Sequence, residues 1–314
     1  MVEPALGKLA LGKLAPGNLA NLPKWRVWLL ATRPATLTAV AAPLAVAAVV
    51  AWRAQAFHFW AFAAALAGAF FIQIGTNFAN DVFDFEKGAD TAARKGPLRV
   101  TQAGLVTPLQ VKRAMWLAFA LAVACGVYLV QLRGWPLVAL GLASIASGIL
   151  YTGGPAPLGY LGLGDVFVFG FFGVAAVVGA VFVQVGVIVP ESWLWSVPVG
   201  ASCTAILVVN NLRDADTDRV AGKRTLAVRI GKRFARGEYV TLMAFALLMA
   251  PIVAIAQQRI ALLLPLVAAP AVFRTALVIL KSQDADELNQ ALATTAKLHL
   301  ALAALLAVGL ALDR

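Results

Sequence analysis

Nine apolar stretches, each roughly as long as a membrane-spanning helix, divide this chain and limit its fold more than any other feature. A spanning helix needs about 20 mostly apolar residues, and 61% of the chain is hydrophobic while only 13% is charged. Soluble domains carry a much larger charged share. The sequence therefore predicts an all-α, polytopic membrane protein with about nine transmembrane helices around a central cavity. The expected spans are residues 35–52, 57–79, 110–131, 136–152, 163–189, 192–210, 238–256, 260–280 and 290–312.

The residues ahead of the first span, 1–24, lack a long apolar core followed by a small-residue cleavage site. We expect a cytoplasmic N-terminal tail there rather than a signal peptide, with residues 25–314 forming a single transmembrane domain. Cys125 and Cys203 each fall inside an apolar span without a Cys-x-x-Cys spacing. They are expected to be packing residues rather than a disulfide or a metal site.

The basic residues gather on one side of the predicted bundle. A net charge of +11 would suit nucleic acid, but the lysines and arginines lie mostly in the tail and in the loops after the second and sixth spans. Such an excess marks the cytoplasmic side of a membrane protein. The charge therefore indicates topology, with a lipid bilayer and no nucleic acid as the partner. The basic residues on the other side or within spans are Arg53, Arg133, Arg259, Arg314, Arg274 and Lys297.

Four acidic residues gather directly after the second apolar span, between Asn80 and Asp90. Residues four apart on a helix lie on nearly one face, so Asn80 and Asp84 are expected to share a face near the cytoplasmic end of this span. Asp81 forms a neighbouring stripe with Asn77, and Gln73 precedes them.

A second cluster, Asn210, Asp214 and Asp218, repeats this four-residue spacing at the end of the sixth span, on the same predicted side. Carboxylates at the edge of the hydrocarbon are costly unless they face a cavity, a cation or a paired charge. Two similar polar faces at one depth therefore predict one shared site.

The chemistry of such a site follows from its oxygen donors. Mg²⁺ is commonly held by one or two carboxylates together with substrate phosphates, so the clusters indicate Mg²⁺ and a phosphorylated substrate. A diphosphate on an allylic lipid would be stabilised as a leaving group, and an intramembrane cavity would keep water from the resulting cation. Neither Asp84 nor Asp218 has an evident structural partner in the sequence, so we expect alanine at either position to spare folding.

Aromatic residues lie near both predicted interfaces. The loop from Tyr151 to Asp165 is rich in glycine and proline, which indicates irregular backbone. Tyr151 and Tyr160 in this loop are either interfacial belt residues or substrate contacts. At the opposite interface an aromatic belt is expected from Trp52, Trp60, Trp135, Trp193 and Trp195.

With these motifs the chain resembles the UbiA superfamily of intramembrane aromatic prenyltransferases over nearly its whole length. Members are all-α with about nine spans and two Asp-rich motifs. The spacing of Asn80, Asp84 and Asp90 is longer than in many members and is similar to the branch that uses 1,4-dihydroxy-2-naphthoate in menaquinone synthesis. Also similar to that branch are the run Arg33-Pro34-Ala35-Thr36-Leu37 and the loop from Tyr151 to Asp165. Further similar segments are Asn210 to Asp218 running into Gly222-Lys223-Arg224-Thr225-Leu226-Ala227-Val228, and Leu288-Asn289 followed after five residues by Thr295-Ala296.

The resemblance implies a role for individual residues. Catalytic roles are implied for Asp84, Asp214 and Asp218. The implied Mg²⁺ ligands are Asn80, Asp81, Asp84, Asp90, Asp214 and Asp218. Many members carry a basic residue shortly after the tyrosine equivalent to Tyr151, but residues 152–164 contain none, so Arg94, Lys95 or Arg99 is expected to replace it. The implied diphosphate-binding residues are Arg213, Lys223, Arg224, Arg94, Lys95 and Arg99. The implied cavity or acceptor residues are Asn77, Gln73 and Tyr151.

The resemblance also implies a reaction. A polyprenyl group would pass from its diphosphate to 1,4-dihydroxy-2-naphthoate with loss of the carboxyl group, giving demethylmenaquinone and diphosphate. The enzyme would lie in the bacterial inner membrane with its active site towards the cytoplasm. The same metal motifs would serve another aromatic acceptor such as 4-hydroxybenzoate. A polytopic transporter is the alternative from another class. A transporter would be expected to carry mid-membrane charges in internal repeats, whereas the acidic residues of this chain gather at one side of the membrane.

Overall fold

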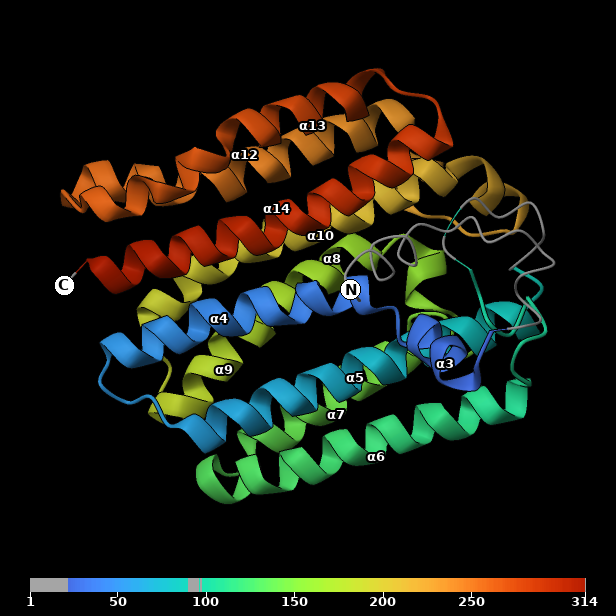
Figure 1. Cartoon of the computed structure of the whole chain (residues 1–314), viewed down its shortest axis with the longest axis horizontal. Helices are drawn as coiled ribbons and strands as arrows, with labels where there is room; N and C mark the ends of the chain where they lie inside the picture. The colour runs from blue at the N-terminus through green and yellow to red at the C-terminus, as the bar shows by residue number, and fades with distance from the viewer. Residues whose placement is uncertain (1–21, 90–95, 97, 314) are drawn as a thin grey trace.

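The computed structural model describes residues 22–89, 96 and 98–313, and all of the regular structure in these residues is helical (Figure 1). Most of the expected N-terminal tail, as well as Asp90, Arg94 and Lys95, lies outside the described residues. The long helices are α4 (Thr38–Arg53), α5 (Phe59–Glu86), α6 (Pro108–Arg133), α7 (Pro136–Leu150), α9 (Ala176–Val185), α10 (Pro190–Val220), α12 (Lys232–Gln257), α13 (Ala269–Lys281) and α14 (Ala285–Leu312). The shorter elements are α3 (Lys24–Thr32), η1 (Pro34–Leu37), η2 (Leu158–Leu161), α8 (Gly164–Val168), the π-helical η3 (Phe169–Ala175), α11 (Leu226–Arg229) and η4 (Ile260–Ala268).

The predicted membrane spans are confirmed, with two informative differences. Within the described residues, eight helical segments are long and apolar enough to cross a membrane, and α7 is a shorter apolar helix beside them. The protein is therefore a multi-pass membrane protein of about nine spans. However, α5 continues to Glu86 and α10 to Val220, well past the apolar stretches at 57–79 and 192–210. The described residues of both acidic motifs thus lie on helix ends rather than in loops.

Local sequence explains where several helices begin and end. Thr107 and Gln110 form a reciprocal capping box at the start of α6, with Pro108 in the first turn. Asp284 accepts a hydrogen bond from the backbone N–H of Glu287 and caps α14. At the far end of α9, Gly186 adopts a left-handed conformation (φ 86°) and stops the helix.

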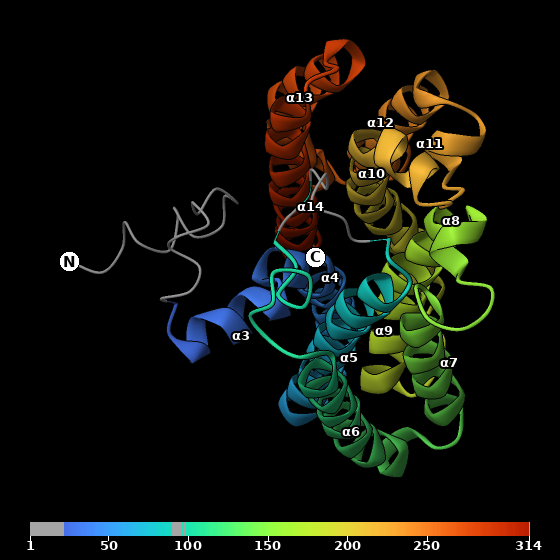
Figure 2. The ribbon, with the colours of Figure 1, turned by 90° about the vertical axis from the view of Figure 1, so that its right-hand side faces the viewer.

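Helix α10 is the most buried of the eight long apolar segments among the described residues, and Figure 2 shows the bundle nearly end-on. It packs against α4, α9, α12, α14 and η3. A Cβ atom on Gly173 would lie 2.6 Å from the Cα atom of Gly200, so η3 and α10 touch backbone to backbone. Small residues permit such close crossings in lipid.

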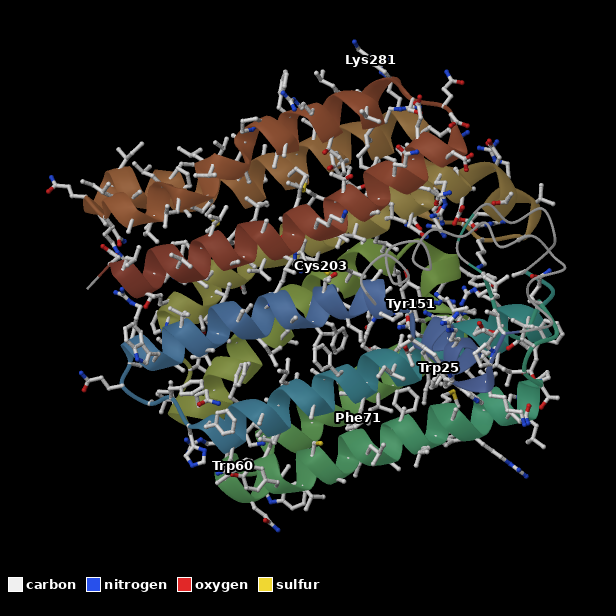
Figure 3. The ribbon with its side chains drawn as sticks, in the orientation of Figure 1. Trp25, Trp60, Phe71, Tyr151, Cys203 and Lys281 are labelled. Atoms are coloured by element: carbon white, nitrogen blue, oxygen red, sulfur yellow. The ribbon has the colours of Figure 1, made fainter. Side chains whose placement is uncertain are left out.

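The two ends of the bundle differ in their share of polar atoms. Nitrogen and oxygen atoms gather around the end of the bundle near Tyr151, whereas Trp60 lies towards the other end (Figure 3). Trp52, Trp60, Trp135 and Trp193 are exposed, as a lipid-facing belt requires. The prediction for Trp195 was wrong. This residue of α10 is fully buried in a cluster with residues of α4, α9, α12, η4 and α14, and its Nε1 donates to Glu191 Oε1 at 3.1 Å.

Candidate active site

One large cavity of about 1430 Å³ lies inside the bundle. Helices α4, α5, α6, α7, α9, α10 and α14 and the segment η3 contribute to its wall. On α5 the lining residues recur every three or four positions from Ala65 to Asp84, which spans roughly 28 Å at the helical rise of 1.5 Å per residue. The part of this stripe from Ala65 to Ile72 is apolar. The part nearer the C-terminal end of α5 carries Gln73, Asn77, Asn80 and Asp84. The cavity is therefore a long apolar chamber with a polar head.

Asp84 has three side-chain hydrogen-bond partners in the polar head. It is 1% exposed, and its Oδ1 accepts hydrogen bonds from the hydroxyl of Tyr160 at 2.9 Å and from Nζ of Lys223 at 3.1 Å. Its Oδ2 accepts from Nη2 of Arg99 at 2.9 Å. The expectation that Asp84 has no structural partner was therefore wrong. Three segments far apart in the sequence meet at this one carboxylate.

Two lysine ammonium groups lie close to the ring of Tyr160. Nζ of Lys87 is 5.2 Å and Nζ of Lys223 is 4.9 Å from the ring centroid, which is within cation–π range. Lys87 also donates to the carbonyl oxygens of Thr152 (2.7 Å) and Gly154 (2.9 Å). Loss of hydration lowers the pKa of Lys87; Asp84 opposes that shift and Lys223 adds to it. The loop after α7 has no basic residue between positions 152 and 164, and the positive charges next to it belong to Lys87 and Lys223.

The second acidic motif is organised by Arg213. Its Nε and Nη2 donate to the two carboxylate oxygens of Asp214 at 2.8 and 2.5 Å, and Nη2 also donates to Asn210 Oδ1 at 2.7 Å. Its Nη1 donates to Oδ1 of Asn289 on α14 at 2.8 Å. A bidentate arginine fixes the carboxylate in position as well as balancing its charge. All three guanidinium nitrogens of Arg213 are engaged, and its side chain is not part of the cavity wall.

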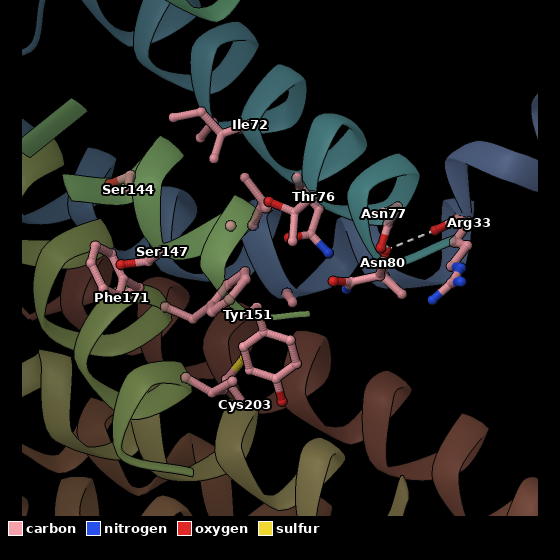
Figure 4. Close-up of a pocket in the computed structure, with 18 of the residues that line it drawn as sticks. Arg33, Ile72, Thr76, Asn77, Asn80, Ser144, Ser147, Tyr151, Phe171 and Cys203 are labelled. Carbon is pink, nitrogen blue, oxygen red and sulfur yellow. Dashed lines mark hydrogen bonds between the residues drawn. The ribbon is translucent and has the colours of Figure 1, made fainter. Parts of the chain in front are cut away.

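The remaining polar wall is formed by α5, α7 and the segment before α4. Figure 4 shows the ring of Tyr151 inside the pocket, with Asn77, Asn80 and Arg33 along one side. Asn77 donates from Nδ2 to the Thr32 carbonyl oxygen at 2.9 Å and to Thr36 Oγ1 at 2.8 Å. The absence of a side chain at Gly164 leaves room for the Tyr151 hydroxyl, since a Cβ there would lie 2.8 Å from it.

The cavity brings together most, but not all, of the predicted site residues. Those in its wall are Gln73, Asn77, Asn80, Asp84, Arg99, Tyr151, Asp214, Asp218 and Lys223. Asp81 lies outside the wall and accepts backbone hydrogen bonds from Val100 and Thr101, both at 3.1 Å, so it fixes the loop ahead of α6. Arg224 is exposed and also outside the wall. The structure therefore gives Asp81, Arg213 and Arg224 positions unlike those expected of metal or diphosphate ligands.

Several site residues carry little signal in the sequence. Nothing in the sequence distinguishes Lys87 from the other basic residues near the cytoplasmic loops. Tyr160 fits an interfacial belt and a substrate contact equally well. Arg33 lies in the cavity wall with a left-handed backbone conformation (φ 50°), which is uncommon for a residue other than glycine and often marks a functional position. Its place directly before Pro34 is the available signal.

The oxygen donors of the polar head fit Mg²⁺ by their chemistry. An ionised carboxylate offers about four lone-pair sites; Asp84 uses three of them and Asp214 two in the contacts described above. Asn80 Oδ1 accepts one bond, from Thr152 Oγ1 at 2.9 Å. Among the described residues, no three His, Cys, Asp or Glu side chains are grouped closely enough to hold a metal alone. A site shared between a few carboxylates and a substrate phosphate is the usual arrangement for Mg²⁺.

Comparisons with known proteins agree with this geometry. The model of the UbiA prenyltransferase family matches residues 40–309. The chain is 35% identical over 289 residues to the 1,4-dihydroxy-2-naphthoate octaprenyltransferase of Escherichia coli, covering 88% of this chain and 92% of that protein. It is 39% identical over 219 residues to the protein of the same name from Mycobacterium tuberculosis, covering 70% of this chain and 75% of that protein.

A solved structure supports the fold independently. The UbiA homolog from Archaeoglobus fulgidus, solved bound to DMAPP and Mg²⁺, matches with a TM-score of 0.61 at 15% identity, covering 90% of this chain and 99% of that chain. The expected resemblance and the all-helical fold are thereby confirmed.

Proposed function

Because the chain belongs to the UbiA prenyltransferase family, we propose that it transfers a polyprenyl group from a polyprenyl diphosphate to 1,4-dihydroxy-2-naphthoate. The observation that carries this proposal is the continuity of the cavity. Its polar head holds residues of both acidic motifs, and its apolar chamber extends from that head for most of the length of α5. A diphosphate and its lipid tail have matching surroundings in one space.

The reaction breaks the bond between the allylic carbon and the diphosphate oxygen. The ring carbon that carries the carboxylate forms the new carbon–carbon bond, and the carboxylate leaves as CO₂, returning its bonding electron pair to the ring. The direct product is the hydroquinone form of demethylmenaquinone, together with diphosphate. No oxidant is needed for this step.

Residues of both motifs would hold the diphosphate and a divalent ion, which we propose to be Mg²⁺. The oxygen donors are Asn80, Asp84, Asp214 and Asp218. When bound, Mg²⁺ supplies positive charge to the leaving diphosphate. Lys223 and Arg99 lie against Asp84 in the same wall, so they are placed to balance the charge that develops on the phosphates. Asp81, Arg213 and Arg224 are not part of this proposed site.

The acceptor carboxylate requires a cation of its own. Arg33 lies in the wall on the side of Asn77 and Tyr151 (Figure 4), so we assign it to the acceptor, with the Tyr151 ring beside the naphthalene system. The apolar wall excludes water from the allylic cation. Replacing Arg33 by methionine is expected to raise the KM for the acceptor while the KM for the donor stays unchanged; an unchanged acceptor KM would contradict this assignment.

The active site is proposed to face the cytoplasm of a bacterial inner membrane, on the basis of the basic residues around the polar head. In a variant without native cysteines, a cysteine at the exposed position Val220 should react with an impermeant reagent only from the cytoplasmic side, and one at Trp135 only from the other side. Reaction of both from one side would refute this topology.

The acceptor is tested with purified protein, a labelled polyprenyl diphosphate and a panel of aromatic acids. The proposal expects dihydroxynaphthoate to be prenylated in preference to 4-hydroxybenzoate. Transfer to 4-hydroxybenzoate alone would contradict the proposed acceptor, although the protein would still be a prenyltransferase. Family membership favours an enzyme over the transporter alternative.

A further inference from the structure

Gln73 is the polar residue farthest from Asp84 in the stripe that α5 presents to the cavity. Its side chain lines the cavity and is only 9% exposed. Among the described residues, none forms a hydrogen bond with its carboxamide. Burying an amide without a hydrogen-bond partner is costly. A ligand with a polar group at this depth would complete the missing hydrogen bonds.

Two hydroxyl groups stand in the wall close to this depth. Thr76 on α5 and Ser147 on α7 both line the cavity, and neither hydroxyl forms a hydrogen bond within the part of the chain that the structure describes. A Cβ atom built on Gly148 would overlap the Thr76 hydroxyl, so α5 and α7 touch at this point. Figure 4 shows Thr76 and Ser147 in the wall of the pocket that holds the Tyr151 ring. We call Gln73, Thr76 and Ser147 the deep polar band.

The prenyl donor does not supply a partner for this band. Its polar group is the diphosphate, which the proposed site holds at Asp84. Gln73 lies eleven positions before Asp84 on the same helix, roughly 16 Å away at 1.5 Å per residue. The remainder of the donor is a hydrocarbon chain, which offers no hydrogen-bonding group. The aromatic acceptor is therefore the substrate whose chemistry matches the band.

The two hydroxyl groups of 1,4-dihydroxy-2-naphthoate are not equivalent. The 1-hydroxyl is next to the carboxylate and can donate to it within the molecule, whereas the 4-hydroxyl needs a partner outside the molecule. The acceptor carboxylate was assigned to Arg33, which lies beside Asn77 (Figure 4). Gln73 is one helical turn farther along α5 from Asn77, roughly 6 Å at 1.5 Å per residue. This separation is comparable to the span of one substituted ring.

We propose that the Gln73 carboxamide binds the 4-hydroxyl of the acceptor and thereby distinguishes 1,4-dihydroxy-2-naphthoate from aromatic acids that lack this group. The inference rests on the proposed function. A carboxamide both donates and accepts hydrogen bonds, and Thr76 and Ser147 offer a second partner to the same hydroxyl. A site built to bond a hydroxyl rejects an analogue without it, because a buried polar group of the protein is then left unpaired. The 4-hydroxyl is meta to the carbon that forms the new bond, so its recognition acts on binding more than on the chemical step.

Equilibrium binding of two radiolabelled acids tests this role. 1-Hydroxy-2-naphthoate keeps the carboxylate and the 1-hydroxyl but lacks the 4-hydroxyl. Both acids are bound to purified protein in nanodiscs, with Mg²⁺ and a non-reactive thio analogue of geranyl diphosphate present. The wild type is expected to bind the dihydroxy acid about tenfold or more tightly than the monohydroxy acid. Gln73→Met, which is similar in size, should weaken binding of the dihydroxy acid by about tenfold and leave binding of the monohydroxy acid unchanged.

A second glutamine in the cavity wall provides the matched control. Gln131 also lines the cavity and lies two residues before Arg133. Arg133 Nη2 donates to the Gln184 carbonyl oxygen at 2.6 Å, and the Gln184 side chain accepts from the backbone N–H of His58 at 2.6 Å, just before α5 begins. Gln131 therefore lies at the end of the cavity away from Asp84. Gln131→Met should leave the affinities for both acids unchanged.

Unchanged binding of the monohydroxy acid shows that Gln73→Met is folded. An equal loss with both acids in this variant, no loss with either, or equal affinities of the wild type for the two acids would overturn the role of Gln73. Failure of the proposed function is a separate result, in which the wild type forms no prenylated dihydroxynaphthoate when the reactive donor is supplied. A wild type that binds neither acid would contradict both.

Discussion

Nζ of Lys223 lies 3.1 Å from Oδ1 of Asp84, although 139 positions separate the two residues in the sequence. Asp84 belongs to the first acidic motif and Lys223 follows the second, so this contact joins the two motifs at one point of the cavity wall. Arg99 and Tyr160 complete the arrangement around the same carboxylate. The site is thus assembled by long-range charge pairing as well as by the packing of helices.

Replacing Asp84 separates its chemical role from its structural role. Asp84→Asn keeps the shape but removes the charge, so transfer is expected to fall by about 100-fold or more. Asp84→Ala also leaves the buried Arg99 and the half-buried Lys223 without their carboxylate, which costs about 3–5 kcal/mol of stability. Activity and thermal unfolding of the purified variants check both effects. Glu86→Gln is the control, because its pair with Lys112 is largely exposed and should contribute little. A wild-type turnover number in Asp84→Asn would contradict the proposed role of the Asp84 carboxylate in the reaction.

Asp218 offers a cleaner test of the second motif, because it is only half-buried and lines the cavity. Asp218→Asn is expected to lower turnover by about 100-fold with little change in unfolding temperature. Asp216 lies on the same helix but is exposed and paired with Lys232 at 2.7 Å. Asp216→Asn should therefore remain active. Similar activities in the two variants would show that loss of an acidic group on this helix, rather than a ligand in the cavity, explains any effect.

Lys223 and Arg224 are neighbours in sequence with different surroundings. Lys223 lines the cavity and contacts Asp84, whereas Arg224 is exposed and contributes its backbone N–H to the Tyr160 carbonyl oxygen at 3.0 Å. We expect Lys223→Gln to lower kcat by about tenfold or more, since a charged contact to the leaving group is lost. Arg224→Gln should stay close to wild type. Steady-state kinetics with both substrates varied give the comparison. Equal effects of the two changes would contradict a specific role of Lys223 at the diphosphate, and both residues would then serve only the orientation of the protein in the membrane.

The spans could be predicted from the sequence because hydrophobicity over about 20 residues is a strong signal. Their ends could not, since α5 and α10 continue as helices through polar residues that the apolar stretches exclude. Helical spacing correctly placed Asn80 and Asp84 on one face and gave Asn210, Asp214 and Asp218 the same arrangement. This spacing also predicted that the two motifs share one cavity, which the structure confirms for their described residues. The same motifs carried the family resemblance, which is also confirmed.

Side-chain direction is what the sequence left undetermined. Asp81 and Asp84 lie three positions apart on one helix, yet one caps a loop and the other lines the cavity. Which carboxylate faces the cavity depends on where residues 98–101 pack, and no local pattern encodes that. Arg213 shows the same limit, because its expected partner was a phosphate while its actual partners are Asp214, Asn210 and Asn289.

The central claim is tested most directly by following the carboxyl carbon. Purified protein receives a polyprenyl diphosphate and dihydroxynaphthoate labelled at the carboxylate, with and without Mg²⁺. We predict that labelled CO₂, diphosphate and the prenylated hydroquinone form in equal amounts, that all three require Mg²⁺, and that Asp84→Asn and Asp218→Asn lower the rates of all three together by about 100-fold. A prenylated product that keeps the carboxyl label, or diphosphate release without any prenylated product, would contradict the account.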